Sequence, residues 1–110
     1  MILEVAMLNV RSGQGAEFES AFRDASTIIA SMPGYLDHEL HRCLEVDDKY
    51  LLLVRWRTLT DHTIGFRESP GYQTWKTLLH HFYRPFPVVE HYHPIVQIGG
   101  VAREPDLPGE

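Results

Sequence analysis

The spacing of hydrophobic residues changes several times along the chain, and each change predicts a new element. Between residues 2 and 10, apolar side chains occupy most positions with two polar interruptions, which is typical of a strand buried on both faces. From Ala16 the spacing becomes three and four residues, which predicts a helix that packs one stripe against a core. Pro33 and Gly34 end this helix. Its stripe consists of Phe18, Phe22, Ala25, Ile29 and Met32.

The second half of the chain predicts a hairpin, two helical segments and a last strand. A polar turn separates two strand-like segments, which favours a β-hairpin. Ser69 and Pro70 have the residue types of a helix N-cap and first helical position, and the helix that follows ends before the segment 84–87. The predicted elements are strands at 35–44, 49–57 and 88–95, a short helix from Thr60 to about Arg67, and the helix that Ser69 begins.

The order strand, helix, strand, strand, helix, strand predicts an α+β fold of the ferredoxin-like type. Its four strands form one antiparallel sheet with both helices on one face. Residues 1–95 form this single domain, and residues 96–110 are expected to be an additional strand, a flexible tail, or one followed by the other.

Both faces of the predicted sheet are apolar, although the helices can cover only one of them. In the first strand, Leu3, Val5 and Met7 alternate with a second apolar set, and the third strand shows the same alternation. A second apolar face needs a cover. We therefore expect a homodimer in which two sheets pack face to face.

Composition excludes several classes of protein and kinds of site. The formal net charge is −5, and a general nucleic-acid-binding protein would carry the opposite sign. Cys43 is the only cysteine, which excludes an internal disulfide and a multi-cysteine zinc site. No apolar run approaches the ~20 residues that cross a membrane, and no leader pattern is present, so we expect a cytoplasmic protein without a nucleic-acid or membrane partner.

Five short motifs together resemble the antibiotic biosynthesis monooxygenase (ABM) domain over about residues 2–95. The most specific of them joins a strand that ends at Trp56 to the pattern His62-x3-Phe66-x2-Ser69-Pro70-x-Tyr72. The others are Gly34-Tyr35, Glu39-Leu40-His41-Arg42, Leu53-Val54-Arg55-Trp56-Arg57 and Pro87-Val88-Val89-Glu90-His91-Tyr92. The resemblance implies a dimeric α+β barrel whose members oxygenate aromatic phenols or quinols, or cleave heme.

Cofactor-independent oxygenation requires a flat apolar pocket, a group that takes a proton, and exclusion of water. The resemblance places this pocket between the helices and the sheet, with Phe66, Tyr72 and Trp75 as the residues that bind a small aromatic substrate. Asn9 and His62 are the candidate catalytic residues, because an amide can orient a substrate and an imidazole titrates near neutral pH. No metal or other cofactor is expected, and O2 is the co-substrate.

Several alternatives remain open for these residues. The three aromatic side chains could be ordinary core, Asn9 could serve a turn, and His62 could lie on the surface. The protein could also be a dimeric barrel that binds a small apolar ligand without catalysis. Heme degradation is disfavoured, because the expected iron-ligating histidine falls near Lys76, and His80 lies one helical turn further along.

The remaining histidines and arginines carry weaker hypotheses. His91 and His93 share a strand face, but nothing in their spacing demands a metal. Arg55 and Arg57 flank Trp56, and we expect ion pairs with Glu39 or Glu45 across the hairpin rather than an anion site. Cys43 has no base nearby in the sequence and is interpreted as structural.

Overall fold

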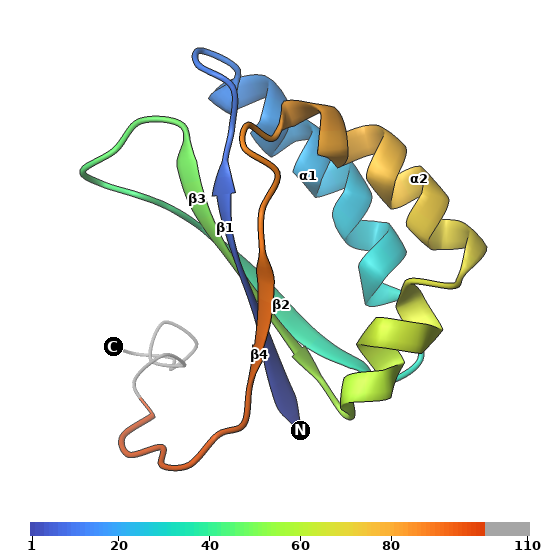
Figure 1. Cartoon of the computed structure of the whole chain (residues 1–110). Coiled ribbons are helices and arrows are strands. Elements are labelled where there is room, and N and C mark those ends of the chain that lie inside the picture. The colour runs from blue at the N-terminus through green and yellow to red at the C-terminus, as the bar shows by residue number, and fades with distance from the viewer. Residues whose placement is uncertain (101–110) are drawn as a thin grey trace, which may run out of the picture.

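The computed structural model describes residues 1–100, and its elements follow the predicted order (Figure 1). Two short helical segments accompany the main helices: η1 (Asp61–Phe66), which is π-helical, and η2 (His80–Phe82), a 3-10 turn. None of the helices in this part of the chain is long and apolar enough to cross a membrane. The main elements are β1 (Ile2–Asn9), α1 (Gly15–Ala30), β2 (Tyr35–Arg42), β3 (Lys49–Trp56), α2 (Pro70–Leu79) and β4 (Val89–Tyr92).

The four strands form one antiparallel sheet in the order β2-β3-β1-β4. Figure 1 shows α1 and α2 side by side on one face of this sheet, while the opposite face carries no helix. The prediction of a ferredoxin-like α+β fold is therefore confirmed.

Alternate residues of the strands divide between a helix-covered face and an open face. In β3, Tyr50, Leu52, Val54 and Trp56 are all buried beneath the helices, whereas the residues between them are half-buried. In β1 the buried set is Glu4, Ala6 and Leu8, and Met7 of the other set is 49% exposed. The predicted pair of apolar faces is present, and the described chain covers only one of them.

The start of α2 follows from local chemistry. Ser69 has an extended backbone, its Oγ accepts a hydrogen bond from the Tyr72 backbone N–H at 3.2 Å, and Pro70 occupies the first helical position. This arrangement, predicted from the sequence, fixes where the helix that bears Tyr72 and Trp75 begins.

A glycine sets the approach of η1 to the sheet. Gly34 has a φ of +82°, a left-handed conformation that glycine adopts without strain. A Cβ at this position would collide with the Asp61 side chain, whose Oδ2 accepts a hydrogen bond from the Thr58 N–H at 3.1 Å. The helix itself ends at Ala30, before the predicted Met32, and Gly34 lies in the turn that leads into β2, where it lets η1 pack closely.

The last strand is shorter than the sequence suggests. We predicted a strand over 88–95, but β4 spans only Val89–Tyr92, and residues 93–100 form no regular secondary structure. Tyr92 pairs with Leu3, close to the first residue of β1. Beyond this point β1 offers almost no further residues for β4 to pair with. The predicted additional strand does not occur in 96–100, and residues 101–110 lie outside the described residues.

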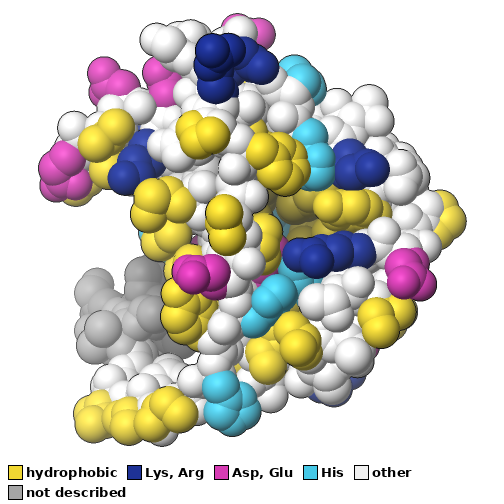
Figure 2. Space-filling model, viewed as in Figure 1, with side chains coloured by type: hydrophobic (Ala, Val, Ile, Leu, Met, Phe, Trp, Pro, Cys, Tyr) yellow, Lys and Arg dark blue, Asp and Glu magenta, His cyan; other side chains and the backbone are white. Residues whose placement is uncertain are grey.

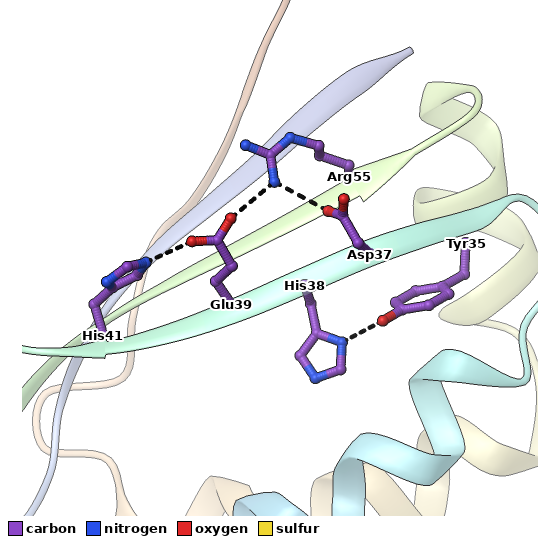
Figure 3. Close-up of polar contacts among 6 residues, drawn as sticks. All are labelled: Tyr35, Asp37, His38, Glu39, His41 and Arg55. Carbon is purple, nitrogen blue, oxygen red and sulfur yellow. Dashed lines mark hydrogen bonds and ion pairs between the residues drawn. The ribbon is translucent and has the colours of Figure 1, made fainter. Parts of the chain in front are cut away.

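An ion-pair network crosses the open face of the hairpin (Figure 3). Arg55 Nη1 donates to Asp37 Oδ1 at 3.0 Å and to Glu39 Oε2 at 3.1 Å, and His41 Nε2 lies 2.8 Å from Glu39 Oε1. Tyr35 and His38 point toward the helices instead. The expected pairing of Arg55 with Glu39 is confirmed, so this arginine is not left as a free anion site.

Candidate active site

A cavity of about 350 Å3 lies between the helix-covered face of the sheet and α2. Figure 2 shows His and Lys/Arg side chains gathered among hydrophobic ones over the region between β4 and α2. The volume of this cavity lies at the small end of the range for small-molecule sites. The aromatic and imidazole side chains in its lining are His62, Phe66, Tyr72, Trp75, His80, Tyr83 and Phe86.

Three aromatic side chains form a rigid wall of this cavity. Phe66, at the end of η1, meets Tyr72 and Trp75 of α2 edge to face, with ring centroids 5.1 and 5.4 Å apart. Such geometry is favourable for aromatic pairs and fixes the orientation of each ring. The wall is therefore formed before any ligand enters, and a flat apolar ring is the shape that complements it.

A buried carboxyl group forms the floor of the same cavity. Glu4 lies on β1 within the helix-facing set and is only 6% exposed. Trp56 Nε1, from the neighbouring strand β3, donates a hydrogen bond to Glu4 Oε1 at 2.9 Å. His62 Nε2, from η1, lies 3.4 Å from that same oxygen. Three elements thus converge on one carboxyl group.

His62 is held between Trp56 and β4. Its ring is 3% exposed and stacks on the Trp56 indole with an interplanar angle of 17° and centroids 5.4 Å apart. Its Nδ1 lies at hydrogen-bond distance, 2.8 Å, from His91 Nε2. The imidazole is therefore fixed in orientation by a stacked ring and a polar partner on another strand.

Burial shifts the pKa values of the two central groups in opposite directions. Removal from water raises the pKa of Glu4 to about 7, against the lowering effects of the Trp56 hydrogen bond and of the Arg67 charge. Burial lowers the pKa of His62 to about 3, and the charges of Arg67 and His91 add to this effect. At neutral pH, His62 is uncharged and Glu4 can both accept and release a proton.

The structure brings together four of the five residues that we predicted for the site. Phe66, Tyr72, Trp75 and His62 all line the cavity. Asn9 does not, because it lies on the open face of the sheet, in a shallow groove with Val5 and Met7.

The predicted alternation along β1 was correct, but the face with Asn9 is not the one that the helices cover. A polar amide at the end of an apolar set was a weak guide to the cavity, because both sets of this strand are apolar. The backbone carbonyl of Asn9 accepts a hydrogen bond from the Arg84 N–H at 2.8 Å, so this residue also joins the strand to the segment after η2.

Sequence reasoning missed Glu4, His91 and Tyr83 as members of the site region. Glu4 had a detectable signal, because it is the one charged residue in the alternating set with Ile2, Ala6 and Leu8. The role of His91 required knowledge of the sheet, where it pairs with Glu4 across β1 and β4. His80, considered as a distant iron ligand, lines the cavity beside Tyr72 and Tyr83.

Within residues 1–100, no three His, Cys, Asp or Glu side chains converge in a way that could hold a metal ion. The nearest approach to such a group is the series Glu4, His62, His91, in which each side chain meets the next one and not a common centre. A linear series of this kind is suited to hydrogen bonding and proton transfer.

Comparisons with known proteins agree with the fold. The family model described as antibiotic biosynthesis monooxygenase matches residues 1–78. The uncharacterized protein YczJ of Bacillus subtilis (strain 168) is 58% identical over 92 residues, covering 84% of this chain and 97% of that protein.

Two solved structures extend the comparison. A Bordetella bronchiseptica protein assigned to the antibiotic biosynthesis monooxygenases superimposes with a TM-score of 0.82 at 30% identity, over 86% of this chain and 97% of that one. SnoaB, a cofactor-independent oxygenase from Streptomyces nogalater, gives a TM-score of 0.66 at 28% identity, over 88% and 94% of the two chains. With the match over residues 1–78 and this level of identity, the chain belongs to the antibiotic biosynthesis monooxygenase family.

Proposed function

We propose that this protein is a cofactor-independent monooxygenase that oxidises a small aromatic phenol or quinol with O2. The observation that carries the proposal is the cavity that combines a preformed aromatic wall with a buried carboxyl–imidazole pair. The similarity to SnoaB, itself a cofactor-independent oxygenase, supports the same reaction class.

The chemistry needs few protein groups. Loss of a proton from a phenol-type ring gives an electron-rich anion, and that anion transfers electrons to O2 directly. For an anthrone, one oxygen atom becomes the new ring carbonyl, and the other leaves as water with the two hydrogens of the oxidised methylene. The protein must bind the ring, take the proton and keep bulk water from the intermediate.

The described residues match these three tasks. Phe66, Tyr72 and Trp75 present apolar ring faces and edges to a flat substrate. Glu4 and His62 are buried, neighbouring groups at the cavity floor that can exchange a proton. Because both groups are largely withdrawn from water, their electrostatic interaction with a charge that develops on the substrate is stronger than it would be in solution.

Oxygen uptake tests this proposal. Metal-stripped protein should consume O2 in the presence of dithranol, a hydroxylated anthrone, above the rate of heat-denatured protein. His62→Gln should lower kcat by ~10²-fold or more, because proton transfer in the site is impaired. His41→Gln, on the open face, is the matched control and should leave the rate unchanged.

The same test distinguishes the oxygenase from the second candidate function, a barrel that binds a small apolar ligand without catalysis. Trp75 lines the cavity, so its fluorescence reports ring binding independently of turnover. If dithranol and related hydroquinones bind by this measurement but no O2 is consumed, the protein is a binding barrel and the oxygenase proposal is wrong.

We also propose that the protein functions as a homodimer. The open face of the sheet carries Val5, Met7, Leu51 and Leu53, all at least partly exposed in the described chain. Burial of such a face favours association by about 25 cal/mol per Å2 of apolar surface removed from water. In the dimer this face packs against its copy, and the cavity under the helices remains within one subunit.

Sedimentation velocity at micromolar concentration should give a dimer for the wild type. Leu53→Asp should shift the protein to monomer, because it places a charge at the centre of the paired faces. Leu59→Asp is the matched control, since Leu59 is exposed in the helical turn directly before η1 and is not part of the sheet. A monomeric wild type would refute the proposed assembly.

A further inference from the structure

We propose that Glu4 is the catalytic base that takes the substrate proton, and that His62 and His91 carry this proton between Glu4 and solvent. The inference rests on the proposed function and extends it with a named base and a named exit path. It is carried by the linear arrangement of the three side chains.

The distances form a continuous path. Glu4 Oε1 lies 3.4 Å from His62 Nε2, and on the other side of the same imidazole Nδ1 lies 2.8 Å from His91 Nε2. The path also leads outward: Glu4 and His62 are buried, whereas His91, on the edge strand β4, is partly exposed. A proton that leaves Glu4 by this route reaches water at His91.

The second oxygen of Glu4 is available to a ligand. Oε1 accepts the Trp56 hydrogen bond, and no hydrogen bond to Oε2 occurs among residues 1–100. The described residues also contain no fully buried side-chain oxygen or nitrogen without a partner, so Oε2 reaches accessible space. Glu4 lines the cavity, and we place the acidic group of the substrate beside this oxygen.

Acid–base strength favours Glu4 over His62 as the group that meets the substrate. A base with a pKa of about 7 is half ionised near neutral pH and is well matched to general-base catalysis. His62, with a pKa of about 3, is a poor terminal acceptor but can pass a proton through its two ring nitrogens. Glu4 is thus the base, and His62 transfers the proton onward.

None of the surrounding groups changes its charge near pH 7 so that it could act as the base instead of Glu4. Arg67 is cationic and favours the ionised carboxyl group, while burial raises the pKa of Tyr83, which stays protonated. Burial lowers the pKa of His91 and of His80 from the ordinary value of 6.5. The remaining neighbours in this region are Trp56, which donates its indole N–H, and Tyr72 of α2.

The proton transfers balance. For an anthrone such as dithranol, a methylene proton moves to the Glu4 carboxylate and leaves the delocalised anthrone anion. Glu4 then gives a proton to His62 Nε2 while the Nδ1 proton of His62 moves to His91 Nε2, and His91 releases its Nδ1 proton to water. The reverse passage supplies the proton needed when the second oxygen atom leaves as water, and it restores the original tautomers.

Kinetics of three variants test the relay with dithranol as the substrate. Glu4→Gln should lower kcat by ~10²–10⁴-fold and abolish the dependence of kcat on pH near neutrality. His91→Gln should lower kcat less, with the loss restored by added imidazole, which cannot restore Glu4→Gln. His93→Gln, two residues further along and exposed, is the matched control and should behave as the wild type.

A resting-state measurement separates failure of the relay from failure of the proposed function. In protein labelled with 15N-histidine, a scalar coupling across the hydrogen bond should connect His62 Nδ1 with His91 Nε2, and both rings should respond to the titration of Glu4. If dithranol consumes no O2 but this coupling is present, the oxygenase proposal fails for this substrate and the path stands. Absence of the coupling, or a His91→Gln variant with the wild-type rate and pH profile, would overturn the relay.

Discussion

The Trp56→Ala variant is expected to lose about 4 kcal/mol or more of unfolding free energy, which is a large share of the 5–15 kcal/mol typical of a small domain. Trp56 is fully buried, and its indole packs against His62, Phe66 and Tyr35. Its removal leaves a large cavity and also takes the only hydrogen-bond donor from Glu4 Oε1 among residues 1–100. Urea denaturation monitored by circular dichroism measures this loss.

Two phenylalanine variants separate packing from hydrogen bonding. Trp56→Phe should lower the unfolding free energy by about 2–3 kcal/mol, because the Glu4 carboxyl group loses its indole donor. Trp75→Phe is the matched control: Trp75 is also buried, but among residues 1–100 its indole N–H makes no hydrogen bond, so a loss of about 1 kcal/mol is expected.

The same pair of variants tests the electrostatics of Glu4. The Trp56 hydrogen bond lowers the Glu4 pKa against the effect of burial, so this pKa should rise above about 7 in Trp56→Phe and stay unchanged in Trp75→Phe. Equal losses of stability in the two variants, with no change in the titration of Glu4, would contradict the assignment.

The second large expected effect concerns the pH dependence of the unfolding free energy. This dependence should run in opposite directions in the Glu4→Gln and His62→Gln variants. The Glu4 pKa rises from 4.5 to about 7 on folding, so between these values the folded state keeps a proton that the unfolded state has released. Stability from this group is therefore complete below pH 4.5 and is lost as the pH rises to about 7.

His62 acts in the opposite direction. Its pKa falls from 6.5 to about 3 on folding, so between these values the unfolded state binds a proton that the folded state excludes. Stability from this group is complete above pH 6.5 and is lost as the pH falls toward 3. In the wild type, the two dependences oppose each other between pH 4.5 and 6.5, and the unfolding free energy should be nearly constant there.

Each variant removes one of the two opposing contributions. Glu4→Gln should become more stable as the pH rises from 4.5 to 6.5, and His62→Gln less stable, each by on the order of 1 kcal/mol per pH unit. Urea midpoints at several pH values give these slopes, with His93→Gln as the control for loss of an exposed histidine. Parallel slopes in the two central variants would show that the groups do not titrate as the structure requires.

The elements of this fold could be read from the sequence because they depend on local periodicity. A nearly continuous apolar run identified β1, spacing of three to four residues identified α1, and Ser69-Pro70 identified the start of α2. These features require only neighbouring residues. Phe66, Tyr72 and Trp75 were named from the resemblance to the family, and all three line the cavity.

The sequence by itself determined the order of the elements and the two apolar sets of β1 and β3. It could not determine which set of β1 faces the helices, because both sets are apolar, and Asn9 was assigned to the cavity for this reason. Only the tertiary structure decided that Glu4 meets Trp56 and His62, and that His91 meets His62. The physical reason is that these contacts depend on strand register and helix placement, which join residues distant in the chain and leave no local pattern.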